Sequence, residues 1–446
     1  MSRNALIAIG MLIGITTSAS IAEAQNLSPE QKPAQWWSVF QDPVLDDLMV
    51  RGTLDNTSIE EASARLAHAQ ASLKAAQADL YPQVGAAAAV TNQSGQLIND
   101  AGGIGTLFNT GLNFSFDLDL FGRLAKARSA ANLEAKAGQA LLASARLLTQ
   151  AQIADVYFQI RGLDAERSIQ RNTIKESAEA ESIQAQLRQS GLISDVILAR
   201  LRAEHRADRA ELVALDQRRA ELEHALAFLS GASADQFQLP ESKDAARLPD
   251  VPSGIPSDLL RRRPDVVAAG FMEQSAKAKV EAAKLAWLPS FSLTGSGGLV
   301  STDLASLFNP AAASFGLGGF LASVLFDGGR QEAGVMAAKE DDQLASAQYR
   351  TQVLNAFRDV KDQLTAVQSL NEQAVEQREI LQQDEKATRL ILSSFESGLA
   401  DRLDVLVARR QQAQDLRQEE QLRARRFSAV TRLIKSLGGG WTAPQT

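Results

Sequence analysis

The chain has 446 residues, a formal net charge of −7 and no cysteine. The lack of cysteine excludes disulfides, thiol nucleophiles, cysteine-ligated metals and a lipid anchor on an N-terminal cysteine, and the mildly acidic charge is unfavourable for nucleic-acid binding. The three histidines lie far apart on segments with helical patterns, so exposed helix positions are favoured over a metal site: His68, His205 and His224.

The first 24 residues have the pattern of a secretory signal peptide. Arg3 supplies a positive start, residues 5–16 form an apolar stretch, and Ala22-Glu23-Ala24 is a small-residue cleavage pattern. We therefore expect a signal peptide over residues 1–24 and a mature chain that begins at Gln25. The apolar stretch is shorter than the roughly 20 residues that span a bilayer, which argues against a membrane anchor.

No later stretch of the sequence is long and apolar enough to predict a transmembrane helix. If the protein enters a membrane, it must do so as a closed β-barrel, the other structure that pairs its own backbone polar groups in lipid.

The two halves of the sequence carry the same markers at one offset. Leu80-Tyr81-Pro82 matches Trp287-Leu288-Pro289, Arg123 matches Arg330, and Gly191 matches Gly398, each pair being separated by 207 positions (289 minus 82). A fixed offset across unrelated kinds of marker indicates an internal duplication. The proline-rich segment 231–257 predicts a non-helical linker between the copies.

Each copy is expected to contain a β-hairpin, a very long helix, a turn and a returning helix. The first repeat covers 25–230, with a hairpin over 83–121, a long helix over 123–190, a tip over 191–195 and a return helix over 196–230. The second covers 258–440, with a hairpin over 290–327, a long helix over 330–396, a tip over 397–401 and a return helix over 402–437. Residues 441–446 form a C-terminal tail.

The clearest strand pattern precedes the first long helix. Between residues 112 and 120, leucine and phenylalanine alternate with asparagine, serine and aspartate, which predicts a strand with one apolar and one polar face. The corresponding second-repeat segment, 315–326, is diluted by glycine. Four strands cannot close a barrel, because known membrane barrels start at about eight. Two chains would supply eight strands and three would supply twelve, and the residues alone do not choose between them.

The segment 123–190 contains no proline and few glycines, so it predicts one helix on the order of 100 Å long. Its apolar positions follow a heptad pattern built mostly from alanine, which suits a thin wall with water on both sides. Arg219 interrupts the similar leucine pattern of the return helix. A coiled-coil scaffold would show the same heptads, but it would not need amphipathic strands at one end. The seam residues are Ala130, Leu133, Ala137, Ala140, Ser144, Leu147, Ala151, Ala154 and Phe158.

Several short motifs resemble one family. Trp36-Trp37, Phe40, Asp42-Pro43 and the run Leu259-Leu260-Arg261-Arg262-Arg263-Pro264-Asp265, together with the duplicated plan, are similar to the OprM/NodT branch of TolC-like outer-membrane efflux proteins. The resemblance covers essentially the whole mature chain. Members of this branch commonly carry an N-terminal lipobox cysteine, whereas this chain has Gln25 there. Barrel insertion would then have to hold the protein alone.

The resemblance implies a fold class, a function and partners. The fold would be mostly α with a membrane β-barrel: a TolC-like trimer with four strands per protomer in a 12-stranded barrel, continued by a long α-helical coiled-coil periplasmic tunnel. An equatorial domain would include the linker 231–257 and both mature termini. The protein would sit in the outer membrane and conduct small molecules such as drugs or xenobiotics passively. Its partners would be a periplasmic adapter protein and an inner-membrane RND-type pump, with no cofactor.

The resemblance also assigns the two tips to adapter docking. Gly191 and Gly398 have a local reason as well, because a helix reversal commonly needs a left-handed residue. The predicted docking residues are Gly191, Leu192, Ser194, Asp195, Gly398 and Leu399.

The same comparison makes Asp404 a candidate for a periplasmic gate, with Asp401 and Arg402 beside it. Three carboxylates that meet on one axis repel each other and bind cations. The competing interpretation is local: Asp401 caps the return helix and Asp404 favours its dipole. A second family gate position is Val407 here, which leaves a single acidic ring.

On the strand, Asp117 and Asp119 are predicted to face the barrel lumen. An enzyme interpretation finds no phosphate loop, nucleophile elbow or metal-ligand cluster in the sequence. Two alternatives to small-molecule efflux stay open at this stage: a duct for type I protein secretion and a soluble periplasmic scaffold.

Overall fold

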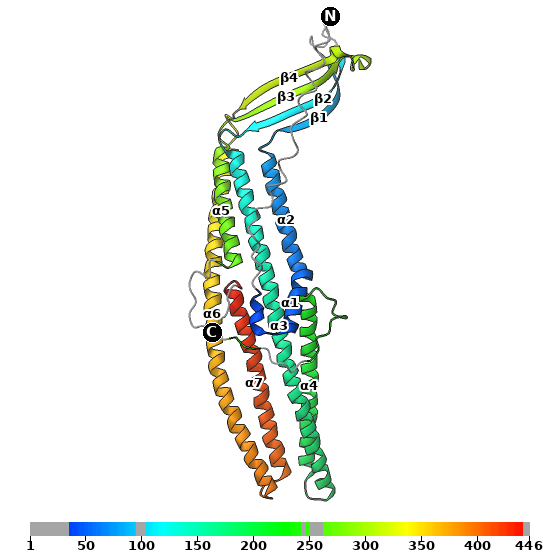
Figure 1. The fold of residues 1–446 in the computed structure, drawn as a ribbon, viewed down its shortest axis with the longest axis vertical. Coiled ribbons are helices and arrows are strands. Elements are labelled where there is room, and N and C mark those ends of the chain that lie inside the picture. Colours follow the sequence, from blue (N-terminus) through cyan, green and yellow to red (C-terminus); the bar gives the residue numbers. More distant parts are fainter. Residues whose placement is uncertain (1–34, 95–103, 242–246, 250–261, 440–446) are drawn as a thin grey trace.

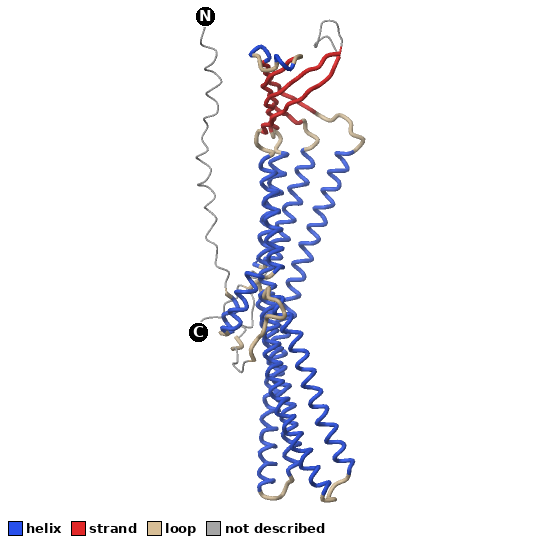
Figure 2. The backbone as a smooth tube through the Cα atoms, turned by 90° about the vertical axis from the view of Figure 1, so that its right-hand side faces the viewer, coloured by secondary structure: helices blue, strands red, loops and turns tan. Residues whose placement is uncertain are grey.

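The computed structural model describes residues 35–94, 104–241, 247–249 and 262–439. These residues form a long rod of helices with a β-sheet at one end (Figures 1 and 2). The predicted signal peptide, much of the linker and the C-terminal tail lie outside the described residues. None of the described helices has an apolar stretch long enough to cross a bilayer.

The helices and strands occur twice in the same order, and corresponding helices have the same lengths. The first repeat contains α2 (Thr57–Ala78), β1 (Gln83–Ser94), β2 (Ile104–Leu118), α3 (Arg123–Gln189) and α4 (Asp195–Leu229). The second contains α5 (Pro264–Leu285), β3 (Ser290–Ser301), β4 (Ala313–Ala322), α6 (Arg330–Glu396) and α7 (Arg402–Ser436). Helices α3 and α6 each have 67 residues, and α4 and α7 each have 35. Before the first repeat come the short helix η1 (Trp36–Phe40) and α1 (Pro43–Asp55).

The four strands form one antiparallel sheet in the order β1-β2-β3-β4. Gln83 pairs with Ser115, and the residues 207 positions later, Ser290 and Ala322, also pair with each other. The duplication therefore extends to the strand register. Between β3 and β4 lie two short helices, η3 (Leu304–Ser306) and η4 (Pro310–Ala312).

The register gives the sheet one apolar and one polar face. Because paired residues share a face of a sheet, Val84 lies beside Phe114, and Phe114 lies beside Gly295. The apolar face continues through Leu293, Leu317 and the other aligned positions of all four strands. The opposite face carries Asn109, Asn113, Ser115, Asp117, Ser292, Thr294, Ser296 and Ser314. In the glycine-rich strand β4, Phe315, Leu317 and Leu321 lie on the apolar face, whereas Phe320 pairs with Ser292 on the opposite face.

The strand that the alternation between residues 112 and 120 predicted is shorter at its C-terminal end than expected. Strand β2 ends at Leu118, because the carboxylate of Asp119 accepts hydrogen bonds from the backbone N–H groups of Leu124 (2.9 Å) and Ala125 (2.7 Å). These bonds satisfy donors at the start of α3, which have no partner inside the helix. In the second repeat β4 ends at Ala322, and Asp327 accepts three such bonds from the start of α6.

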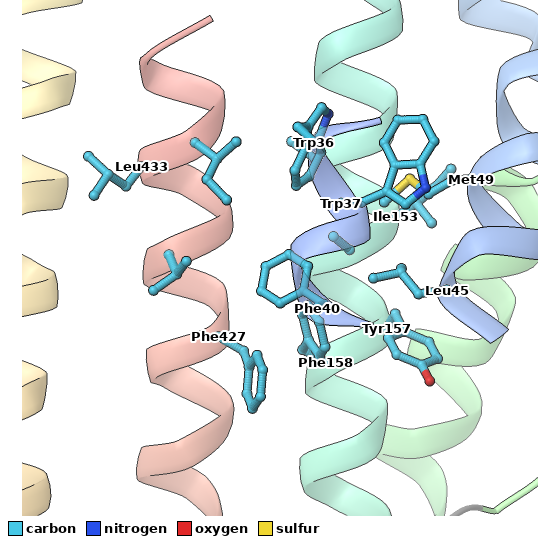
Figure 3. Close-up of a cluster of buried hydrophobic side chains, with 14 of the residues drawn as sticks. Trp36, Trp37, Phe40, Leu45, Met49, Ile153, Tyr157, Phe158, Phe427 and Leu433 are labelled. Carbon is cyan, nitrogen blue, oxygen red and sulfur yellow. The ribbon is translucent and has the colours of Figure 1, made fainter. Parts of the chain in front are cut away.

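The main hydrophobic core lies at mid-height of the rod, where η1 packs between α3 and α7 and α1 packs against α3 (Figure 3). Phe158 stacks on Phe427 with ring centroids 4.4 Å apart, and Phe40 meets Phe158 edge-on at 4.8 Å. Asp42 caps α1 and also accepts a 2.6 Å hydrogen bond from the hydroxyl of Tyr157. The aromatic residues of the N-terminal motif thus join the two repeats at one level.

A buried ionic network explains why Arg219 interrupts the leucine pattern of α4. Its guanidinium donates to Asp164 (2.6 Å), Glu223 (2.7 Å) and the carbonyl oxygen of Leu239 (2.7 Å). Arg161 donates to the next carbonyl, that of Pro240, at 2.6 Å. The network therefore holds the start of the linker against the helical hairpin formed by α3 and α4, at the level of the core.

In the second repeat, Arg263 joins the start of α5 to the end of α7. It precedes Pro264 at the start of α5, pairs with Asp265 at 2.7 Å and donates to the backbone carbonyl of Ser436 at 3.2 Å. The arginine thereby satisfies one of the unpaired carbonyls at the end of α7. This contact gives the last part of the Arg-Arg-Pro-Asp run a structural role.

Candidate channel wall and periplasmic tips

The two helical turns at the end of the rod opposite the sheet have the same backbone (Figure 1). At the first turn, Gly191 has φ of 76°, and the N–H of Leu192 donates to the carbonyl of Leu187 at 3.0 Å. At the second, Gly398 has φ of 75°, and Leu399 donates to Ser394 at 2.8 Å. Both are Schellman motifs, in which a left-handed glycine lets the chain reverse.

Different side chains bridge the two turns. In the first, Arg188 forms a bidentate pair with Asp195 at 2.5 and 2.8 Å, and this arginine lowers the pKa of the Asp195 carboxyl. At the offset of 207 the second turn has Phe395 and Arg402, and the guanidinium lies 5.9 Å from the ring centroid. An ion pair is thus replaced by a cation–π contact.

The tips also present apolar side chains to solvent. Leu192 and Leu399 are 71% and 85% exposed, and Val196 is 76% exposed. Ser194 stands at the N-cap of α4, but its side chain accepts no capping hydrogen bond. Exposed leucines at a fixed turn are suited to contact with another protein.

The predicted gate residues lie together at the start of α7. Asp401 accepts a hydrogen bond from the N–H of Asp404 (2.9 Å), and Asp404 accepts one from the N–H of Asp401 (3.0 Å). The pair forms a capping box, so the local interpretation of both carboxylates is confirmed. Asp404 stays exposed, and Val407 is 68% exposed one turn later. The acidic ring stays a prediction, since it concerns several chains.

Arg402, expected beside the gate, also belongs to a series of α7 arginines whose other members the sequence analysis did not single out. Arg402 binds Glu179 on α3 at 2.6 Å. Arg410 reaches Glu204 and Asp208 on α4 at 3.1 and 2.9 Å. Arg402, Arg410 and Arg417 recur at spacings of eight and seven residues, which place them near one face of a helix, and this is the signal that could have found them. The remaining contacts of this face join Arg409 to Glu176 (3.6 Å) and Arg417 to Gln170 (2.8 Å) and Glu211 (3.0 Å).

A buried hydrogen bond between the helices of each hairpin is duplicated. Gln170 donates to the backbone carbonyl of Asp208 at 2.8 Å, and Gln377, 207 positions later, donates to that of Asp415 at 3.0 Å. The two aspartates then differ in their partners. Asp208 pairs with Arg410, whereas Asp415 faces Asp384, where hydrogen bonding to Asp415 raises the pKa of Asp384 to about 6.

The two aspartates proposed for the lumen have different positions. Asp117 is exposed on the polar face of β2, paired with Ser292 on β3. Asp119 lies beyond the strand and caps α3, as described above. The lumen assignment of Asp117 stays a prediction, and the carboxylate of Asp119 is engaged at the helix start.

An amphipathic sheet continued by paired helices of this length is the architecture of a membrane channel wall. The chain belongs to the outer membrane efflux protein family, whose sequence model matches residues 53–232 and 255–439. The predicted family is therefore confirmed, and the two matched segments correspond to the two repeats.

Relatives and solved structures agree with this membership. The pyoverdine export outer membrane protein OpmQ of Pseudomonas putida is 30% identical over 441 residues, covering 96% of this chain and 91% of OpmQ. The cation efflux system protein CusC of Escherichia coli is 28% identical, covering 93% and 90%. The solved structure of the outer-membrane channel OprN matches with a TM-score of 0.83 and 26% identity, covering 91% of this chain and 92% of that one.

These matches confirm the predicted fold class, the outer-membrane location and the channel function of the chain. The outer membrane protein VceC of Vibrio cholerae also shares the fold, with a TM-score of 0.79 over 91% of this chain and 99% of VceC. The family is made up of channel proteins.

Proposed function

We propose that three copies of this chain form a 12-stranded barrel in the outer membrane, continued by a tube of twelve helices into the periplasm. The observation that carries the proposal is the sheet: one face is largely apolar, the other is largely polar, and the outer edges of β1 and β4 have no strand partner among the described residues. In lipid, unpaired strand edges are excluded, so the sheet must close with other copies. Twelve strands exceed the minimum of about eight for a membrane barrel.

The cargo we propose is small solutes delivered by an inner-membrane pump of the RND type through a periplasmic adapter. OpmQ is named for pyoverdine export and CusC for cation efflux, which favours small molecules over secreted proteins. A passive duct accepts what its pump delivers. Its wall therefore needs a polar surface that keeps the bore filled with water more than it needs a binding pocket. The polar face of the sheet and the thin helical wall meet that need.

Reconstitution tests the proposal. Purified protein in detergent should have the mass of three chains by light scattering and should produce single-channel conductance in planar bilayers. Deletion of the gene should increase retention of small toxic solutes, and the wild-type gene should restore their export. A monomer that fractionates with soluble periplasmic proteins and gives no conductance would contradict the proposal and favour the scaffold.

The exposed leucines Leu192 and Leu399 are the adapter contacts that we propose at the tips. Replacing both by aspartate should abolish export in cells while conductance of the purified channel stays unchanged. The matched control is Leu304→Asp, because Leu304 is also exposed but lies on η3, at the end of the molecule opposite the tips. Export that survives the double substitution would remove the tips from the docking surface.

For the gate we propose that Asp404 of three chains rings the periplasmic opening. Asp404→Asn is the informative variant, because asparagine keeps an oxygen to accept the N–H of Asp401 while it removes the charge. Conductance should rise and block by multivalent cations should weaken, with unchanged thermal stability. Unchanged conductance and block would leave Asp404 with its capping role alone.

A further inference from the structure

The junction between the sheet and the helices carries exposed aromatic side chains. Tyr81 and Trp287 stand at the turns that lead into β1 and β3, and Phe121 and Phe326 stand at the turns that follow β2 and β4. Tyrosine and tryptophan favour the boundary between a bilayer and water, because the ring is apolar and its polar group can stay wet. The periplasmic edge of the bilayer is therefore expected at this junction.

Unpaired basic side chains begin at the same junction. Arg123 opens α3 and Lys126 follows three residues later, so the two are neighbours on the helix surface. Both are exposed, and neither forms an ion pair with a described residue. On α5, which packs against α3, Lys284 pairs with Glu281 at 2.8 Å. That hydrogen bond and the nearby charge of Lys126 lower the pKa of the Glu281 carboxyl, which places Lys126 on the side of α3 that faces α5.

Arg123 borders a cleft at the level where the start of α3 and the end of α5 meet the sheet (Figure 1). The cleft has an empty volume of about 360 Å³. Two of its lining residues, Leu118 and Phe291, pair with each other on the apolar face of the sheet. The apolar surface of the sheet therefore continues into the cleft beside Arg123. The other apolar lining residues are Leu120, Phe121, Leu124, Leu285 and Leu288.

The carboxylates at the cleft are turned to other tasks. The oxygens of Asp119 accept the N–H groups of Leu124 and Ala125, where a carboxylate balances the positive end of the helix. Asp117 borders the cleft from the polar face of β2. An anion that approaches along the apolar face is thus separated from Asp117 by the strand itself.

We propose that this cleft binds one phospholipid of the periplasmic leaflet, with Arg123 and Lys126 donating to its phosphate and an acyl chain lying against Leu118 and Phe291. Guanidinium and ammonium groups are suited donors for phosphate. A phosphate with an acyl chain satisfies both parts of the cleft, whereas free phosphate leaves the apolar wall in contact with water.

The class of lipid follows from the charges. Two unpaired cations favour a headgroup with a net negative charge, because the ammonium of a zwitterionic headgroup would bring a further positive charge to the site. The inference rests on the proposed insertion of the sheet in the membrane, and it adds a lipid class to that insertion.

The second repeat lacks this combination of side chains. Arg330 corresponds to Arg123 at the offset of 207, but Lys126 corresponds to Ala333, and Glu332 lies in the first turn of α6. Arg330 thus opens its helix as Arg123 does, without a second cation beside it. One such site per chain is expected, and Arg330 serves as the matched control for a change of charge.

Quenching of Trp287 fluorescence by brominated lipids tests the assignment, because this exposed indole precedes Leu288 of the cleft. The purified protein is inserted into nanodiscs of phosphatidylcholine that contain a minor fraction of a lipid brominated on its acyl chains. Brominated phosphatidylglycerol should quench more strongly than brominated phosphatidylcholine at the same fraction. Trp287→Phe gives the background from the other tryptophans.

The variants separate a built site from a general attraction to basic residues. Arg123→Gln should reduce the preference for phosphatidylglycerol, and adding Lys126→Gln should abolish it, so that the two lipids quench equally. Arg330→Gln should leave the preference in place. A loss in Arg330→Gln as large as in Arg123→Gln would overturn the site. Light scattering checks that each variant has the mass of the unsubstituted protein, which is expected because all three side chains are exposed.

The unsubstituted protein separates the remaining outcomes. Added inorganic phosphate should not change the preference, and a preference lost on its addition would mean that the site binds phosphate without the lipid. Equal quenching by the two brominated lipids would overturn the lipid site and leave the channel intact. No quenching by either lipid would place Trp287 away from the bilayer and would overturn the proposed insertion of the sheet as well.

Discussion

The two helical hairpins, α3 with α4 and α6 with α7, have one backbone plan and two sets of side chains. The first is held by buried ion pairs around Asp164, while the corresponding position in the second is Asn371, which accepts a single hydrogen bond from Arg426 at 3.0 Å. Asp208 has an arginine partner, while Asp415 has a second carboxylate. The comparison teaches that the duplicated parts fix the shape, and that the substituted parts decide how firmly each hairpin is held.

The largest expected effect comes from making the first hairpin resemble the second. Asp164→Asn leaves Arg161, Arg167 and Arg219 around a neutral side chain in a site where Asp164 is 3% and Arg219 is 11% exposed. Removing one partner of a buried pair costs roughly 3 to 5 kcal/mol. Chemical denaturation should show this loss.

The control for that prediction is Asn371→Ala, which removes one hydrogen bond and should cost only about 1 kcal/mol. Equal losses at both positions would mean that the network around Asp164 does not anchor the first hairpin more firmly.

A smaller effect is expected at the tips, and it should be the same in both hairpins. Gly191→Ala and Gly398→Ala each place a side chain at a positive φ with no crowding within 4 Å. The left-handed conformation of an L-residue costs roughly 1 to 2 kcal/mol, and thermal denaturation would measure it. A large difference between the two variants would show that the turns are not equivalent in the assembled protein.

A pH dependence is expected from the carboxylate pair of the second hairpin. The pKa of Asp384 is raised to about 6 by its hydrogen bond to Asp415, so the stability it contributes is fully present below its ordinary pKa and is lost as pH rises through about 6. Asp384→Ser, which installs the residue type of Ser177, should remove this loss. The melting temperature at pH 5 and pH 8 would then differ less than in the unmodified protein.

Asp341→Ser is a suitable control for that measurement, because Asp341 is exposed on the same helix. If it flattened the pH profile as much as Asp384→Ser, the carboxylate pair would not be the cause.

The smallest effect is expected where the hairpins meet near the tips. Arg402 and Glu179 are 30% and 44% exposed, and such pairs contribute about 1 kcal/mol or less. Glu179→Gln should change the melting temperature little, and the change should vanish in high salt. A shift comparable to that of Asp164→Asn would assign the anchoring of the second hairpin to this contact.

Periodicity made much of this architecture predictable. The helices of 67 and 35 residues follow from long stretches without proline, and the repeat offset found in short motifs is the one that relates the strand pairs. Strand ends were less predictable, because Asp119 continues the alternation of β2 in the sequence while its carboxylate binds the start of α3.

One sequence does not show which carboxylate each arginine of α7 binds. Arg402, Arg410 and Arg417 are visible as residues near one face of α7, but the carboxylates that bind them lie far away in the sequence on other helices. Only the packing of α7 against the hairpin of α3 and α4 brings them together. The capping box at Asp401 and Asp404 is different, because both partners are three residues apart and the pattern is local.

The unpaired outer edges of β1 and β4 have a consequence for how the protein reaches its membrane. A lone chain presents two long strands with free N–H and C=O groups and an apolar surface, which favours aggregation in water and is excluded in lipid. Insertion and assembly must therefore be one coupled event, in which the bilayer admits the sheet only as copies join edge to edge. The yield of inserted protein should then depend steeply on chain concentration, and helper proteins that shield strand edges would set its rate in the cell.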